Sequence, residues 1–180
     1  MNHTIEIAES CGFCFGVRRA VEMVYDLRHK TDKRIYVIGE LIHNGIFIER
    51  LKKDGIFCLE SEADIAALAP QKAEIVLVIR THGVTKQLSE RLSADGFEVV
   101  DATCPFVRRI HKIVEENTRD GSPVVIVGDK NHPEVVGIES YAHGNAVVCS
   151  NETECAEFMK KECYIHKKTP ILVSQTTGNH

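Results

Sequence analysis

A unit of apolar strand, histidine loop and helix repeats three times along this chain. Apolar runs at 35–38, 75–79 and 124–127 are each followed by one histidine and then by an amphipathic segment that stops at a glycine. Unbroken Val and Ile runs of this length are typical of strands buried on both faces, and their alternation with helices indicates parallel βαβ units with right-handed crossovers. The sequence therefore predicts an α/β fold.

The histidines of this repeat are His43, His82 and His132, and each follows the carboxyl end of its strand. In an open parallel sheet these loops share one edge, which is where ligands bind. A helix cap is the simpler explanation for any one of these histidines alone. Their recurrence in three units favours a common site.

Two cysteines are expected at the same edge. Cys14 precedes a predicted helix at 17–27, and Cys104 follows a predicted strand at 97–100. The positive end of a helix dipole stabilises a thiolate, which is the form that binds metals. The sequence therefore predicts that both thiols meet at one inorganic site.

The remaining cysteines are expected to be structural or incidental. Seven cysteines are an odd number, and the chain carries no export signal, which argues against a disulfide framework. Cys58 and Cys149 end short apolar strands, so we expect them to pack in the core. Cys11 and Cys14 have the spacing of a dithiol pair or half a zinc site, but no second pair exists, so Cys11 is predicted to be a bystander.

Charge and hydropathy exclude several classes of protein. The net charge is −4, with 22 basic and 26 acidic residues interspersed, so no basic stripe favours nucleic acid or a membrane surface. No apolar run approaches the roughly 18 to 20 residues of a membrane span, and residues 1–20 lack a signal-peptide core. We therefore expect a cytoplasmic protein that holds any anionic ligand by local groups.

Two small domains are expected, with a boundary near Pro105. The first would cover 15–104 and the second 105–180, with strands at 124–127, 146–149 and 171–174. No flexible linker separates them, so they should pack around a shared cleft. His111 is predicted to lie on a solvated basic face of the helix at 107–119.

The last predicted strand, 171–174, is followed by Gln175-Thr176-Thr177, which we interpret as a loop and the N-cap of another helix. A strand without its covering helix would leave one sheet face exposed. This pattern predicts that the 180 residues belong to a longer protein.

Six short motifs, taken together and in order, resemble the amino-terminal part of the LytB/IspH family of 4-hydroxy-3-methylbut-2-enyl diphosphate reductases, which act last in the non-mevalonate isoprenoid pathway. The motifs are Gly12-Phe13-Cys14 with Gly16-Val17 and Arg19-Ala20, His43-Asn44, His82-Gly83-Val84, Asp101-Ala102-Thr103-Cys104-Pro105, His132-Pro133-Glu134-Val135, and Gln175-Thr176-Thr177. They span the whole chain, and in combination they are specific.

The resemblance implies a trefoil of three α/β domains around a [4Fe-4S] cluster. Two small parallel-sheet αβα domains would be present here and the third would be absent from this chain. Cys14 and Cys104 match two cluster ligands, whereas the third cysteine and a Ser–Asn motif that holds the diphosphate lie in the missing domain. Residues 1–14 match a segment whose strand, at 5–7, pairs within that domain, so here this strand would have no sheet.

The resemblance also implies roles at the substrate. His43, His82 and His132 would contact the diphosphate, and Thr176 would help to organise the substrate hydroxyl. Glu134 would donate the proton, since a carboxyl group in a closed cavity beside an anion is more easily kept protonated. On the residues alone, Glu134 is equally well explained as a capping carboxylate after Pro133 in the first turn of a helix.

The implied reaction is reductive dehydroxylation of the allylic diphosphate to isopentenyl and dimethylallyl diphosphate, with electrons from a carrier such as ferredoxin or flavodoxin. Two other classes of function stay open from the residues. One is a zinc or dithiol redox module that uses Cys11 and Cys14. The other is a non-catalytic domain that binds a phosphorylated metabolite through its histidines alone.

Overall fold

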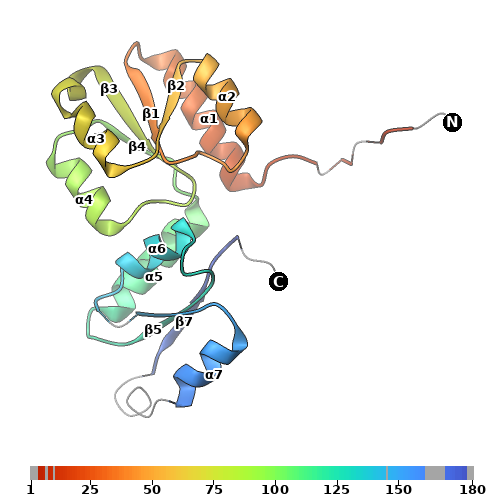
Figure 1. Cartoon of the computed structure of the whole chain (residues 1–180), viewed down its shortest axis with the longest axis vertical. Coiled ribbons are helices and arrows are strands. Elements are labelled where there is room, and N and C mark those ends of the chain that lie inside the picture. Colours follow the sequence, from red (N-terminus) through yellow and green to blue (C-terminus); the bar gives the residue numbers. More distant parts are fainter. Residues whose placement is uncertain (1–3, 7, 10, 145, 161–168, 178–180) are drawn as a thin grey trace.

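The computed structural model describes residues 4–6, 8–9, 11–144, 146–160 and 169–177. Its elements form two units, each built on one parallel sheet, which lie one above the other in Figure 1. The first sheet has the strand order β2-β1-β3-β4 and the second has the order β6-β5-β7. The predicted fold class, two small parallel-sheet α/β units, is confirmed.

The first unit has three layers. Its elements are α1 (Phe15–Lys30), β1 (Arg34–Ile38), α2 (Gly45–Lys53), β2 (Ile56–Leu59), α3 (Glu62–Leu68), the 3-10 helix η1 (Ala69–Glu74), β3 (Ile75–Ile79), α4 (Lys86–Ala94) and β4 (Val99–Asp101). Ala20 and Val24 of α1 pack with Leu51 of α2 on one face of the sheet. Ile65 of α3 and Leu92 of α4 pack on the other. All five residues of β3 are buried, as its unbroken apolar run predicts.

The second unit continues directly from β4. Its elements are α5 (Pro105–Thr118), β5 (Val124–Val127), α6 (Pro133–Ser140), β6 (Ala146–Cys149), α7 (Glu152–Lys160) and β7 (Ile171–Ser174). Val114 of α5 and Ile138 of α6 pack on one face of the sheet. Phe158 of α7 packs on the other face beside Cys149, which is buried as predicted.

Within the two sheets, the predicted strands agree with the structure except at β4. It occupies 99–101 rather than 97–100, because the chain leaves α4 through a turn at Gly96, where φ is +72°. The N–H of Phe97 donates to the Leu92 carbonyl of that helix, so Phe97 closes the turn and its side chain is buried in the core.

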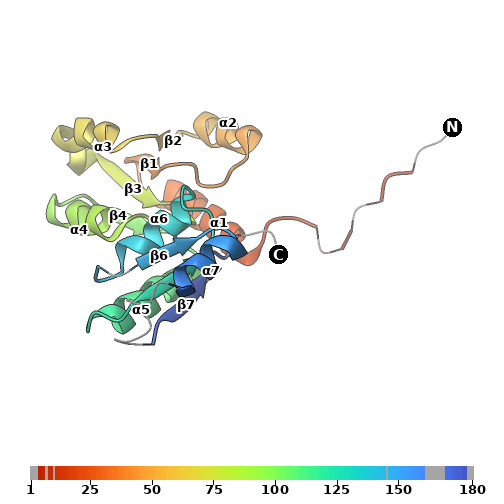
Figure 2. The same ribbon diagram turned by 60° about the horizontal axis from the view of Figure 1, so that its bottom comes forward.

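The described residues before α1 run away from both units (Figures 1 and 2). A strand was expected at 5–7. Ile5 and Glu6 form no strand, Ile5 is 89% exposed, and Ile7 lies outside the described residues.

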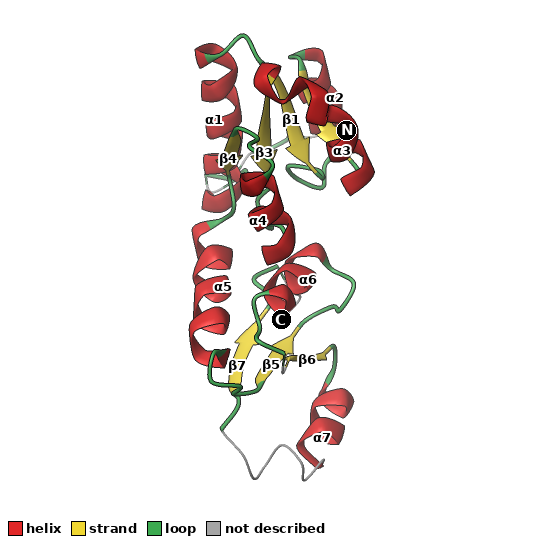
Figure 3. Ribbon diagram, turned by 90° about the vertical axis from the view of Figure 1, so that its left-hand side faces the viewer, coloured by secondary structure: helices red, strands yellow, loops and turns green. Residues whose placement is uncertain are grey.

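Helices α4 and α6 lie between the two sheets and contact each other (Figure 3). The Lys86 N–H donates to the Ser140 hydroxyl at 2.9 Å, and the Lys86 ammonium pairs with Glu115 of α5 at 2.7 Å. The two units are therefore held together by direct polar contacts as well as by packing. Among the described helices, none has the length and apolar character that crossing a bilayer requires.

Candidate functional site

Each sheet has one point where the chain reverses its direction of winding, and both points face the same region. In the first sheet this point lies between β1 and β3, and in the second between β5 and β7. Ligands of open parallel sheets bind at such points, beyond the carboxyl ends of the strands. The loops that follow these four strands carry His43, His82, His132 and Thr176.

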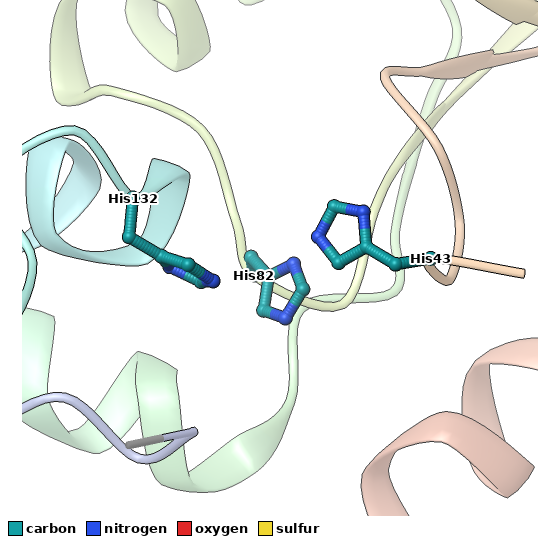
Figure 4. Close-up of side chains that lie close together, drawn as sticks. All are labelled: His43, His82 and His132. Atoms are coloured by element: carbon teal, nitrogen blue, oxygen red, sulfur yellow. The ribbon is translucent and has the colours of Figure 1, made fainter. Parts of the chain in front are cut away.

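The three histidines meet in one cluster, although they come from three different loops (Figure 4). His43 stacks on His82 with ring centroids 5.2 Å apart, and His132 lies edge-on to His82 at 5.1 Å. One ring nitrogen from each residue lies within 4.8 Å of the others. The structure thus brings together the three histidines that the sequence places at one edge.

His82 is the buried centre of this cluster. Its side chain is 9% exposed, and its Nδ1 has no hydrogen-bond partner. Burial, followed by the charges that His132, His43 and Arg80 would carry, lowers the pKa of His82 from 6.5 to about 4. His82 is therefore a neutral imidazole at physiological pH.

The other two histidines are each oriented by one hydrogen bond: His43 by the carboxylate of Glu40, and His132 by the backbone N–H of Glu134. Nδ1 of His43 lies 3.1 Å from Oε2 of Glu40, which favours a proton on that nitrogen. Nδ1 of His132 accepts the N–H of Glu134 at 3.2 Å and so caps helix α6. Neutral His132 must then carry its proton on Nε2.

Thr81 ties the loops of the site together. Its hydroxyl donates to the Leu41 carbonyl at 3.0 Å, and its own carbonyl accepts the N–H of Cys104 at 2.9 Å. The loops that carry His43, His82 and Cys104 are thus joined by two hydrogen bonds through one residue. Sequence reasoning did not identify Thr81.

Cys14 and Cys104 lie at helix N-termini, as predicted: Cys14 is the N-cap of α1 and Cys104 is the N-cap of α5. Both are free thiols, and neither side chain caps its helix. They line one cavity of about 350 Å³ together with His82 and Thr176. Cys11 is not among the residues that line this cavity.

The two thiols are brought to the same cavity by a close approach of helix α1 to Cys104. A β-carbon built on Gly16 would lie 2.7 Å from Sγ of Cys104, which is too close for any side chain. Glycine at position 16 therefore leaves space for that sulfur.

Glu134 is completely buried. One carboxylate oxygen accepts the N–H of Thr176 at 2.6 Å, and the other accepts the hydroxyl of Thr177 at 3.0 Å. Glu134 lies in the first turn of α6, where the alternative explanation placed it, but His132 is the N-cap and the Glu134 carboxylate accepts from the loop after β7 rather than from its own helix. It connects α6 to the loop after β7. Thr176 reaches the site through its backbone N–H, and the N-cap role expected of this loop concerns a helix beyond Thr177, outside the described residues.

His111 contradicts the prediction of a solvated side chain. It is 5% exposed, its ring stacks on Tyr141 with centroids 4.3 Å apart, and burial lowers its pKa to about 4. The signal was present in the sequence: Val107, His111, Val114 and Thr118 are the buried residues of α5, and they follow the helical period. The neighbouring arginines and lysine hid this pattern.

A comparison with protein families identifies one match, to the family described as LytB protein, over residues 5–180. The chain belongs to the LytB family. Curated relatives include 4-hydroxy-3-methylbut-2-enyl diphosphate reductases from Caldanaerobacter subterraneus, 41% identical over 93% of this chain, and from Aquifex aeolicus, 38% identical over 97% of it.

Solved structures of LytB proteins have the same fold. One, of (E)-4-hydroxy-3-methyl-but-2-enyl diphosphate reductase, the terminal enzyme of the non-mevalonate pathway, matches 97% of this chain with a TM-score of 0.78 and 36% identity. The Plasmodium falciparum enzyme matches 94% with a TM-score of 0.81 and 29% identity.

The LytB chain described here is shorter than these proteins. It spans 58% of the Caldanaerobacter relative, 57% of the Aquifex relative, and 59% and 50% of the two structures.

Proposed function

We propose that these 180 residues form two thirds of the active-site wall of a 4-hydroxy-3-methylbut-2-enyl diphosphate reductase. The protein would convert this allylic diphosphate to isopentenyl and dimethylallyl diphosphate, with electrons from a carrier such as ferredoxin or flavodoxin. The observation that carries the proposal is that one residue belongs to two groups of candidate site residues. His82 belongs both to the histidine cluster and to the wall of the cavity that contains Cys14 and Cys104.

The histidine cluster suits an anion better than a metal ion, although its nitrogens are close enough to approach one metal. A metal ligand must offer a lone pair, whereas the hydrogen bond from Glu134 to Nδ1 of His132 places the proton of neutral His132 on Nε2. That N–H can donate to a phosphate oxygen. The guanidinium of Arg80, which acts electrostatically on His82, adds positive charge to the same place. We therefore assign the diphosphate to His43, His82 and His132.

The two thiols fit a four-iron cluster as partial ligands. Both sit at the positive ends of helices, where a thiolate is stabilised, and Gly16 leaves space beside Cys104. We propose that Cys14 and Cys104 would hold the cluster together with a cysteine supplied from outside these residues. Such a cluster supplies single electrons and, at an iron without a cysteine ligand, a Lewis acid for the departing oxygen.

The residues of this chain would bind the substrate and move its proton. The histidines would hold the diphosphate end, so that the hydroxyl end points toward the cavity with the two thiols. Thr176, in the loop after β7, would help to orient that hydroxyl. Glu134 lies within reach of this loop, and its carboxyl group would deliver the proton that the departing oxygen needs.

The test is anaerobic reconstitution of a protein of the relatives' full length that contains these residues, here called the full-length reductase. We expect it to bind iron and acid-labile sulfide and to consume the allylic diphosphate under reduction. Zinc without sulfide would instead favour a dithiol module at Cys11 and Cys14. Diphosphate binding with neither iron nor turnover would favour a non-catalytic binding domain.

A further inference from the structure

His111 is a buried titratable residue that the proposed reaction does not use. It lies on the face of α5 that meets both the first sheet's loops and helix α6, so it belongs to the junction between the two units. Its Nε2 is buried and has no hydrogen-bond partner. A polar ring in such a place has a desolvation cost that no hydrogen bond at Nε2 offsets.

The ring of His111 lies against two glycines. A β-carbon on Gly83 would be 2.9 Å from Cε1 of His111, and one on Gly137 would be 3.4 Å from its Nε2. The Cε1–Nε2 edge of the ring therefore lies against both glycines. Tyr141, at the end of α6, stacks on its face at an interplanar angle of 16°.

Both glycines are adjacent to groups of the site. Gly83 directly follows His82, and it has a φ of +75°, which other residues rarely adopt. Gly137 lies on α6, one turn after Glu134 and five residues after His132. One aromatic ring thus contacts both the loop of His82 and the helix that His132 caps.

We propose that His111 is a positioning residue, whose ring fixes the His82 loop against helix α6 and so sets the distance from His82 to His132 and Glu134. This deepens the proposed function and rests on it only for the effect on diphosphate binding. The spacer role itself depends on the shape of the ring rather than on its charge. A phenylalanine should therefore replace it, whereas an alanine should not.

The test compares three variants of the chain by two measurements. His111→Ala removes the spacer and His111→Phe keeps a ring. Val114→Ala, at a completely buried position on the same helix, removes core packing without touching either glycine. The first measurement is the titration of the His82 ring by NMR, and the second is calorimetric binding of inorganic pyrophosphate.

In His111→Ala we expect the pKa of His82 to rise from about 4 toward 6.5, because the His82 ring becomes more exposed and His132 moves away from it. Pyrophosphate affinity should fall about tenfold, a usual size for coupling between sites. His111→Phe should resemble the wild type in both measurements. Val114→Ala should lower the melting temperature but leave both values unchanged.

An unchanged His82 titration in His111→Ala would overturn the proposal, as would an equal shift in Val114→Ala, which would indicate general loosening. Failure of the proposed function has a different signature. If the wild type does not bind pyrophosphate, the diphosphate assignment is wrong, but the His82 titration still decides whether His111 is the spacer.

Discussion

Turnover by the full-length reductase should fall by roughly 10²- to 10⁴-fold when Glu134 is replaced by glutamine, which is the usual contribution of a positioned general acid. The fold should survive this change. The glutamine oxygen can accept the N–H of Thr176, and its amide can donate to the Thr177 hydroxyl, so both contacts of the buried side chain persist. The measurements are the rate constant kcat under reducing conditions and the free energy of unfolding.

Two further variants separate catalysis from structure at this position. Glu134→Ala leaves the Thr176 and Thr177 donors without their acceptor and should lower the free energy of unfolding by about 1–3 kcal/mol. Glu139→Gln removes a carboxylate from the exposed side of the same helix and should change neither quantity. If Glu134→Gln keeps kcat within tenfold of the wild type, Glu134 only connects α6 to the loop after β7.

The second large effect concerns Cys104. In the full-length reductase, Cys104→Ser should lose nearly all bound iron and acid-labile sulfide, and with them turnover. The affinity for iron should fall by more than the roughly 10- to 100-fold that is lost when a residue hydrogen-bonded to a metal ligand is removed. Iron and sulfide per chain after anaerobic reconstitution measure this.

Cys11→Ser is the matched control, because Cys11 is an exposed free thiol three residues from Cys14 and does not line the cavity. It should retain iron and activity. Loss of iron in Cys11→Ser with iron retained in Cys104→Ser would mean that the metal sits on Cys11 and Cys14, and would remove Cys104 from the site.

Much of the fold could be predicted because local patterns determined it. The unbroken Ile75–Ile79 run requires burial on both faces, and buried parallel strands alternate with covering helices. The parallel topology then brings His43, His82 and His132 to one edge without any knowledge of side-chain contacts. The same reasoning placed Cys14 and Cys104 at helix N-termini.

What could not be predicted depends on contacts between the units. The helical period of α5 indicates that His111 is buried, but not that it lies against Gly83 and Gly137, which are distant in the sequence. The role of Thr81 as a bridge between Leu41 and Cys104 likewise requires the three loops to be in place. Strand β4 begins at Val99 rather than at Phe97, because Phe97 belongs to the turn at Gly96.

The central claim is that the three-histidine cluster holds a diphosphate, and calorimetric titration of the chain with inorganic pyrophosphate tests it most directly. The wild type should bind one equivalent. His43→Ala should weaken binding by roughly 10- to 100-fold, since a hydrogen bond to a charged group contributes about 1.5–3 kcal/mol. His29→Ala, at an exposed position in the last turn of α1, should bind like the wild type. No binding by the wild type, or equal binding by His43→Ala, would contradict the account.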